Sequence, residues 1–144
     1  MPILVNLTQD VMDRGKEPEL GWSYAALTSV DELTTKIGVV YQTEWTIEYG
    51  PEKNAANKGL FVSVGFPAKF LGQAGGKPIK DTVYKFKNMI ASLNGIKTDQ
   101  LSPDQYDLEA LKGKSCWIKI DLATWSDRQQ ITITDFSRDA EIPF

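Results

Sequence analysis

The sequence predicts a mainly β protein of five strands, with one helix between the third and the fourth strand. Three observations predict this class. Short runs of the 144-residue chain alternate apolar and polar residues at period two. One segment in the second half of the chain spaces its apolar residues as a helix does. Polar, glycine-rich stretches separate the runs, and we find neither an internal repeat nor a second domain.

An N-terminal arm and a first strand open the chain. Residues 1–19 are polar and interrupted by glycine and proline, so we expect an extended arm with a short turn of helix near Gln9–Met12. The segment 21–30 has the composition of a strand. Its alternation is loose, which leaves open the face of the sheet that Trp22 and Tyr24 take.

The segments 38–50 and 60–66 are expected to form the second and third strands, joined by a polar loop. Within the third strand, Gly65 indicates either a bulge or a close approach to the backbone. The apolar face of the second strand is predicted to carry Val39, Tyr41, Trp45, Ile47 and Tyr49.

A helix is expected over about 82–93, capped by Asp81 and ended by Gly95. Its apolar side is predicted to carry Val83, Phe86, Met89, Ile90 and Leu93. The motif Ser-Pro-Asp-Gln at 102–105 has the form of a capping box with proline at the first helical position. It therefore predicts a second, short helix that ends by Gly113.

Two strands, over 115–122 and 130–136, are expected to finish the fold. Five strands with a helix between the third and the fourth are the plan of the OB-fold barrel. Such barrels commonly bind oligonucleotides across strands two and three and the neighbouring loops. We expect this OB-fold-like domain over residues 20–136, with a short flexible C-terminal tail after it. In the fourth strand Cys116, Ile118, Ile120 and Leu122 are predicted on one face, with Trp117 and Lys119 on the other.

The composition argues against an enzyme. The chain has no histidine, so it lacks the commonest general base and metal ligand. Its one cysteine, Cys116, excludes an internal disulfide, fits a reducing cytosol and is expected to be a buried, unreactive thiol. We find no phosphate-binding loop, signal peptide or membrane-spanning run. We therefore expect a cytoplasmic protein with no catalysis, metal or cofactor and no membrane partner.

Positive charge is concentrated in the middle of the chain. Residues 51–97 hold eight lysines and two acids, whereas the whole chain has a net charge of −3. This asymmetry predicts one positive surface on a negative protein, as a nucleic-acid backbone requires; a solvated lysine face without a ligand fits the counts equally well. The lysines predicted to contact phosphates are Lys53, Lys58, Lys69, Lys77, Lys80, Lys85 and Lys87.

Aromatic rings meet a second requirement for binding single-stranded DNA, because bases stack on them. Three aromatic residues break the apolar pattern and are candidates for stacking as much as for packing. They are Phe61 on the polar side of the third strand, Trp117 beside Lys119, and Trp125 in a turn beside Arg128. Core positions are expected for Tyr41, Trp45, Phe66, Phe86 and Phe136.

Several longer stretches resemble a known family. They are GWSYAALTSVDELTTKIGVVYQTEWTIEYGPEKNAANKGLFVSVGF, the helix after it, DLEALKGKSCWIKIDL and ITDF. They resemble small phage proteins of the DUF669 type, which have a glycine-aromatic first strand, a Gly-Pro…Lys-Gly link and a Leu-x-Gly-Lys step. The resemblance covers nearly the whole chain. It implies an OB-like fold and a role in phage replication or recombination, and it assigns no site residues.

The tail carries a second and more specific resemblance. The sequence Asp-Ala-Glu-Ile-Pro-Phe is similar to the acidic tip of bacterial single-stranded-DNA-binding proteins (SSBs). The resemblance implies that the terminal ring enters an apolar pocket of a partner, that Ile-Pro packs beside it and that the acids meet a basic rim. The tip departs from bacterial ones because only eight residues (137–144), about 28 Å at full extension, follow the last strand. Its partner-binding residues would be Asp139, Glu141, Ile142, Pro143 and Phe144.

Together these observations predict a non-catalytic phage SSB that coats single-stranded DNA and recruits host or phage replication and repair proteins through its tip. Its place would be the cytoplasm of the bacterial host. A second hypothesis is a decoy that presents the tip to host proteins and binds no DNA; the acidic total charge fits it and the lysine-rich middle does not. A third, an enzyme subunit or inhibitor, is disfavoured by the missing histidine. The sequence leaves open a homo-oligomer, the site size and the choice between DNA and RNA.

Overall fold

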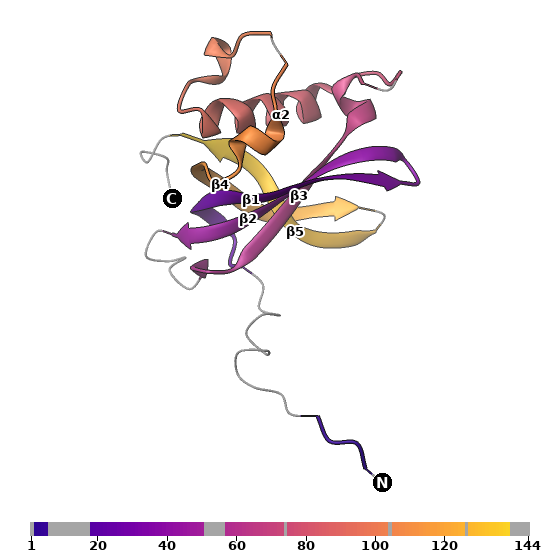
Figure 1. Cartoon of the computed structure of the whole chain (residues 1–144), viewed down its shortest axis with the longest axis vertical. Coiled ribbons are helices and arrows are strands. Elements are labelled where there is room, and N and C mark those ends of the chain that lie inside the picture. The colour runs from indigo at the N-terminus through magenta and orange to yellow at the C-terminus, as the bar shows by residue number, and fades with distance from the viewer. Residues whose placement is uncertain are drawn as a thin grey trace.

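Five antiparallel strands form one sheet in the order β3-β2-β1-β4-β5 (Figure 1). The computed structural model describes residues 2–5, 18–50, 57–73, 75–103, 105–125 and 127–138. The strands are β1 (Gly21–Thr35), β2 (Gly38–Tyr49), β3 (Phe61–Pro67), β4 (Ser115–Trp125) and β5 (Arg128–Ser137). Between β3 and β4 lies the one α-helix of the described residues, α2 (Lys80–Leu93). The predicted mainly β, OB-like fold class is confirmed.

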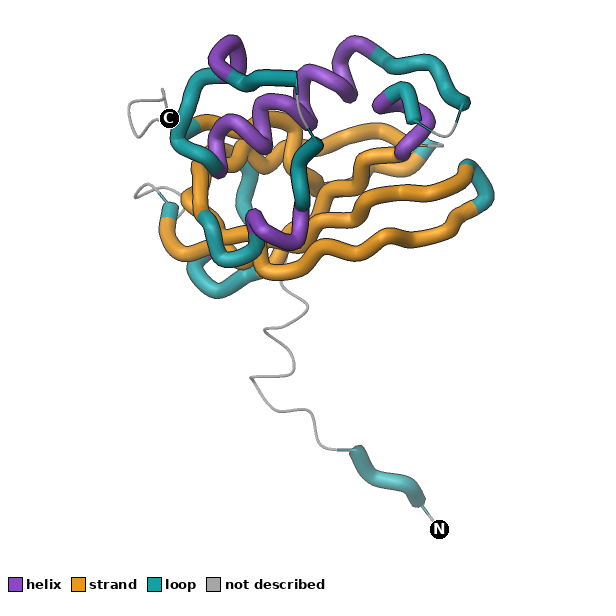
Figure 2. The backbone as a smooth tube through the Cα atoms, turned by 45° about the horizontal axis from the view of Figure 1, so that its top comes forward, coloured by secondary structure: helices purple, strands orange, loops and turns teal. Residues whose placement is uncertain are grey.

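The sheet curls until its two edge strands face one another, but it does not close. Thr132 on β5 donates its hydroxyl to the Ser63 carbonyl oxygen on β3 at 3.0 Å. Within the described residues no ladder joins these two strands, so a seam remains between them. Helix α2 lies across one side of the curled sheet (Figure 2). Among the described residues, neither α2 nor any shorter helical turn has the length and apolar composition of a transmembrane helix.

The core fills the inner face of the curl. In β1 the buried residues are Ser23, Ala25 and Leu27, so Trp22 and Tyr24 lie on the outer face. The core predictions for Trp45, Phe66 and Phe136 are confirmed, because all three side chains are almost fully buried. Tyr41 and Phe86 are partly buried against the same cluster. Cys116 is buried, as predicted, beside Ile118 and Ile120, whereas Leu122 is exposed where β4 extends beyond the core.

Tyr49 does not share the inner face with Trp45 and Ile47, and this prediction was wrong. Ala25 pairs with Ile47, but the next residue back in β1, Tyr24, pairs with Tyr49. Strand β2 therefore contains one extra residue, a β-bulge, which turns Tyr49 to the outer face. The suspected bulge at Gly65 is absent; this residue pairs regularly with Gln42, whose side chain comes close to it.

Helix α2 begins two residues earlier than predicted. Its N-cap is Ile79, which makes no side-chain capping bond, and Asp81 lies in the first turn, where a carboxylate favours the helix dipole. The predicted cap was therefore wrong. The helix ends at Leu93, and Gly95 follows with φ of 71°, as the sequence predicted.

No helix begins at Ser102, so the capping-box prediction was also wrong. The Tyr106 hydroxyl donates a hydrogen bond to the Ser102 carbonyl oxygen, with 2.6 Å between the two oxygens. The short 3₁₀ turn η4 (Leu108–Leu111) begins later, where the Asp107 carboxylate accepts the Glu109 amide at 3.0 Å. Another 3₁₀ turn, η3 (Thr98–Gln100), precedes the motif. The predicted turn near Gln9–Met12 lies outside the described residues.

Candidate nucleic-acid interface

The outer face of the sheet carries a row of aromatic side chains from three strands. Tyr49 on β2 pairs with Tyr24 on β1, which pairs in turn with Trp117 on β4. The two tyrosine rings stack with centroids 5.0 Å apart and planes 19° apart. The indole of Trp117 meets both edge-on, at 5.5 and 5.7 Å. Burial, together with the neighbouring Tyr49 and Glu48, raises the pKa of Tyr24, so its phenol is neutral.

Exposure separates the members of this face. Phe61 is 59% exposed and Tyr49 is 48% exposed, whereas Trp117 is only 6% exposed. The side chain of Trp117 is thus used mainly in packing, and the two exposed rings are the ones that a base could reach. Phe61 pairs with Thr46, on the same outer face and further back along β2 than Tyr49. The stacking role predicted for Phe61 stays a prediction. The exposure of its ring leaves room for a base to stack on it.

Cationic residues flank this face. Lys119 is exposed on β4, where it pairs with Trp22 on β1 and with Asp135 on β5. Lys58 is exposed just before β3. Arg128 is exposed at the start of β5, opposite Trp125, whose side chain lies outside the description. Lys53 also lies outside the described residues.

The lysines between β3 and helix α2 lie away from the aromatic face. Lys69 is in the 3₁₀ turn η2 (Ala68–Leu71), and its side chain comes close to Gly38 of the β1–β2 hairpin. Gly76 packs against the Lys69 backbone. Lys77 is exposed between this turn and helix α2, and Lys80 is exposed as the first residue of α2.

Two further lysines on α2, Lys85 and Lys87, differ in burial. Lys85 is partly buried; its ammonium donates to the Ile133 carbonyl oxygen at 3.4 Å and lies 5.4 Å from the centre of the Phe66 ring. Burial lowers the pKa of Lys85. Lys87 instead lines a groove with Lys97 and Arg138. The described lysines therefore lie on several parts of the molecule, and the prediction of a single positive surface does not hold for them.

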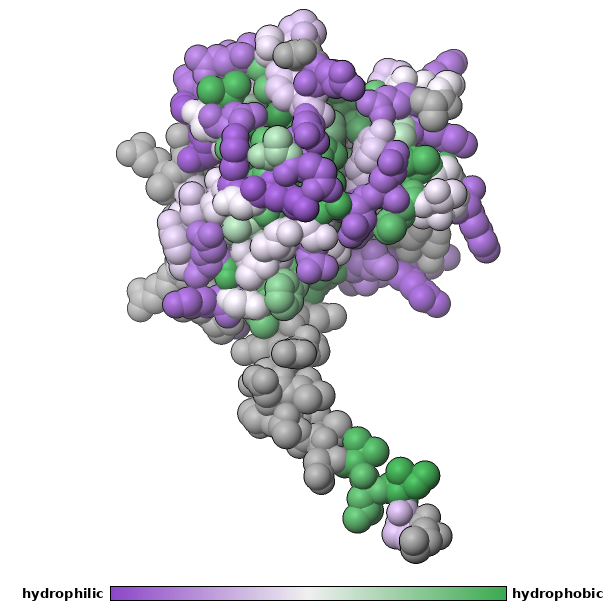
Figure 3. Space-filling view, in the orientation of Figure 1, coloured by the Kyte–Doolittle hydropathy of each residue, from purple (hydrophilic) through white to green (hydrophobic). Residues whose placement is uncertain are grey.

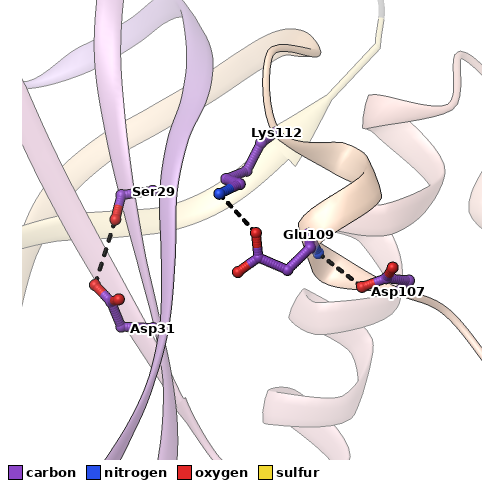
Figure 4. A network of polar contacts seen from close by, with 5 residues as sticks. All are labelled: Ser29, Asp31, Asp107, Glu109 and Lys112. Carbon is purple, nitrogen blue, oxygen red and sulfur yellow. Dashed lines mark hydrogen bonds and ion pairs between the residues drawn. The ribbon is translucent and has the colours of Figure 1, made fainter.

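One region is unsuited to phosphate. A cavity of about 910 Å³ between the β1–β2 hairpin, α2 and η4 is lined by four carboxylates, from Asp31, Glu32, Asp107 and Glu109. Figure 4 shows part of this region: Lys112 pairs with Glu109 at 2.6 Å, and the Ser29 hydroxyl donates to Asp31. The excess of negative charge disfavours a nucleic-acid backbone here.

Sequence reasoning missed Tyr24 and Tyr49 as candidates. Trp22 and Tyr24 alternate with the small residues Ser23 and Ala25 in β1, which could have indicated an aromatic outer face. The alternation of the whole segment is too loose to assign that face from the sequence. No signal in the sequence marks the bulge that brings Tyr49 out. Six residues of the tail, 139–144, lie outside the described residues, and so does every predicted partner-binding contact.

Metal-ligand groupings and the single thiol were the remaining candidates for chemistry in the described residues. Within them no group of three or more cysteine, aspartate or glutamate side chains is arranged to hold a metal ion. Cys116 is buried, and burial raises the pKa of its thiol far above the ordinary value.

No protein-family model matches the chain, and no curated protein is significantly similar to it.

Proposed function

We propose that this protein is a non-catalytic SSB that coats single-stranded DNA during phage replication and recombination, in the cytoplasm of the bacterial host. One observation carries the proposal. Two exposed aromatic rings, Phe61 and Tyr49, lie on the outer face of an OB-like sheet, where such folds bind oligonucleotides. The exposed cations Lys58, just before β3, and Lys119, on β4, support it.

In this proposal the bases stack on the two exposed rings while cations follow the phosphates. Lys58 lies three residues before Phe61, and Lys119 lies two residues after Trp117 on β4; both would neutralise phosphates there. Stacking tolerates any base, so binding would show little sequence preference. Each phosphate contact would release counterions, so affinity would fall as salt rises.

A titration of a fluorescent dT oligonucleotide at about 50 and about 200 mM salt tests this directly. The wild-type protein should bind at low salt and weaken at the higher concentration. Phe61→Ala and Tyr49→Ala should each lower affinity by roughly 5- to 150-fold, the equivalent of one lost base stack. Tyr84→Ala is the matched control, because Tyr84 is equally exposed but lies on helix α2. Equal losses in all three variants would contradict the proposed face.

The proposal extends to the tail, which would recruit replication and repair proteins of the host or phage. The aromatic ring of Phe144 would fill an apolar pocket, and Asp139 and Glu141 would meet basic residues at its rim. Deleting 142–144 should leave DNA affinity unchanged and abolish capture of a bacterial SSB-binding protein. Unchanged capture would contradict the recruiting role.

The decoy hypothesis keeps one specific observation in its favour, which is the net charge of −3. It makes the opposite prediction in the same titration. A protein that binds no oligonucleotide at low salt, yet captures the SSB-binding protein through its tail, would be a decoy. Such a result would exclude the coating role.

A further inference from the structure

The cavity of about 910 Å³ between the β1–β2 hairpin, α2 and η4 has no part in the proposed function. Part of its wall consists of apolar side chains that pack against the core and are still partly exposed. Figure 3 shows apolar surface between hydrophilic residues on this side of the molecule. A ligand in the cavity would cover this surface, which favours binding. The apolar side chains are those of Val30, Tyr41, Phe86, Tyr106 and Leu108.

Carboxylates surround the apolar part of the cavity. Asp31 and Glu32 come from β1, and Asp107 and Glu109 come from the beginning of η4. No lysine or arginine of the described residues lines the cavity. Lys112, outside it, pairs with Glu109 at 2.6 Å, so four carboxylates and one ammonium leave a net charge of −3 (Figure 4). This charge favours a cationic ligand.

One wall of the cavity is a strand edge that has no partner within the described residues. Strand β1 pairs with β4 only over residues 21–26, although it continues to residue 35. On that side its last backbone hydrogen bonds in the described chain join Leu27 to residues 113–114, at 2.8 and 2.9 Å. Successive strand residues point to opposite faces, yet all three of residues 30–32 line the cavity. The cavity therefore runs along the edge of β1 and not only along one face.

An extended peptide matches all three features. Its backbone can pair with a free strand edge, while the cavity accepts its side chains. An apolar side chain suits the wall that Phe86 and Leu108 provide, and neighbouring lysines or arginines can meet the carboxylates. A small cation would use neither the edge nor the apolar wall, and the charge repels a nucleic-acid strand.

We propose that this cavity and the free edge of β1 bind an extended basic peptide of a partner protein, with an apolar residue between lysines or arginines. A second copy of the chain is a poorer occupant. Two-fold pairing of β1 edges centred on the cavity would bring Asp31 and Glu32 of both copies together, and like charges destabilise such pairs. The inference does not rest on DNA binding, because Phe61 and Tyr49 do not line this cavity.

Selection from a random ten-residue peptide display library, with the full-length protein as bait, gives the first test. Enriched peptides should carry two or more lysines or arginines around an apolar residue. A fluorescein-labelled copy of the most enriched peptide then reports affinity by fluorescence anisotropy. Asp31→Asn with Glu32→Gln should weaken its binding by roughly 3- to 30-fold, as the loss of two exposed charge pairs implies.

The matched control is Glu44→Gln with Asp99→Asn, which removes the same two charges from exposed residues outside the cavity and should leave the affinity unchanged. Equal affinities of the two double variants would overturn the proposal. Enriched peptides without basic residues, or no enrichment at all, would overturn it as well. Unchanged thermal unfolding of both variants verifies the fold, since all four substituted side chains are exposed.

Methylation of the peptide backbone tests the pairing with β1. Only alternate amides of a strand point to a given neighbouring strand. N-methyl groups on one alternate set of peptide amides should therefore abolish binding, whereas the same groups on the other set should leave the affinity unchanged. Equal effects of the two sets would mean that the peptide binds through its side chains alone and would overturn the addition to β1.

Discussion

The indole of Trp117 is buried on the outer face of the sheet by two tyrosines from neighbouring strands. Trp117→Ala should therefore lower the free energy of unfolding by about 3–5 kcal/mol, as loss of a buried aromatic ring does. Phe61→Ala, on a mostly exposed ring, should change it by less than about 0.5 kcal/mol. Guanidinium denaturation followed by circular dichroism measures both. Similar losses for the two would mean that Phe61 also serves packing.

Cys116 makes stability depend on alkaline pH. Burial raises the pKa of this thiol in the folded protein, whereas the unfolded chain ionises it near its ordinary value of 9.0. Above that pH the unfolded state binds fewer protons than the folded state, so stability falls as pH rises. The wild type should lose up to about 1.4 kcal/mol per pH unit relative to Cys116→Ala. Denaturation of both proteins from pH 8 to pH 11 measures it; parallel curves would show an exposed thiol.

Residue-level predictions succeeded where periodicity alone decides. Trp45 and Phe66 occupy inner positions of strands whose alternation is regular, so their burial followed from the sequence. Trp117 could not be assigned in this way, because its cover comes from side chains more than 60 residues away in the chain. Tyr49 was placed on the wrong face because one inserted residue reverses the alternation, and no residue type announces it.

At the scale of elements, Asn57 joins the start of β1 to the turn before β3. Its side chain is fully buried; it accepts the Glu19 amide at 2.7 Å and donates to the Glu19 carbonyl oxygen at 2.9 Å. Asn57→Ala should lower the free energy of unfolding by about 1–3 kcal/mol, because it leaves these groups unpaired. Hydrogen exchange should show faster opening at the first residues of β1. Lys58→Ala, next in the chain and exposed, is the control and should alter neither quantity.

The loop between η2 and α2 depends on a glycine for a different reason. A Cβ atom at Gly76 would lie 2.5 Å from the Lys69 carbonyl oxygen and 2.6 Å from its Cα atom. These are backbone atoms that cannot turn aside, so Gly76→Ala should cost about 1–3 kcal/mol of stability. Lys77→Ala, the exposed neighbour, should cost less than about 0.5 kcal/mol. Thermal unfolding of the two variants checks this; equal midpoints would mean that the loop adapts freely.

The elements themselves were predictable in number and order, and their ends less so. All five strands and α2 were expected, because their apolar periods are long enough to identify. The Ser-Pro-Asp-Gln motif failed because a capping box only starts a helix that tertiary contacts then stabilise. Here the Tyr106 hydroxyl donates a hydrogen bond to the Ser102 carbonyl oxygen, and a 3₁₀ turn begins six residues after Ser102.

At the scale of the whole molecule, strand number and helix position were enough to predict the OB-like order. The open seam between β3 and β5 was not predictable, since sheet closure depends on how far each strand curls. The distribution of lysines was not predictable either. A run of charge in the sequence gathers on one surface only if the segment is a single element, and here residues 58–87 cover a strand, a turn, a loop and most of a helix.

The helix and the sheet should unfold as one unit. Asn88 on α2 donates to the Asp135 carboxylate at 2.8 Å and to the Phe136 carbonyl oxygen at 2.7 Å. The ring of Phe136 packs in turn against Trp45, with centroids 5.3 Å apart. Loss of α2 would therefore uncover the core, and no stable intermediate with a folded sheet should remain.

Two probes test this cooperativity in a variant with Trp22→Phe and Trp125→Phe, which keeps Trp45 and Trp117 as buried reporters. Helix content by circular dichroism and tryptophan fluorescence should change with one denaturant midpoint, because the same contacts hold both signals. Asn88→Ala should lower both midpoints together, since it removes the two hydrogen bonds from α2 to β5. If helix content fell first while the tryptophans stayed buried, α2 would be a separately unfolding cover and the sheet alone would be the stable unit.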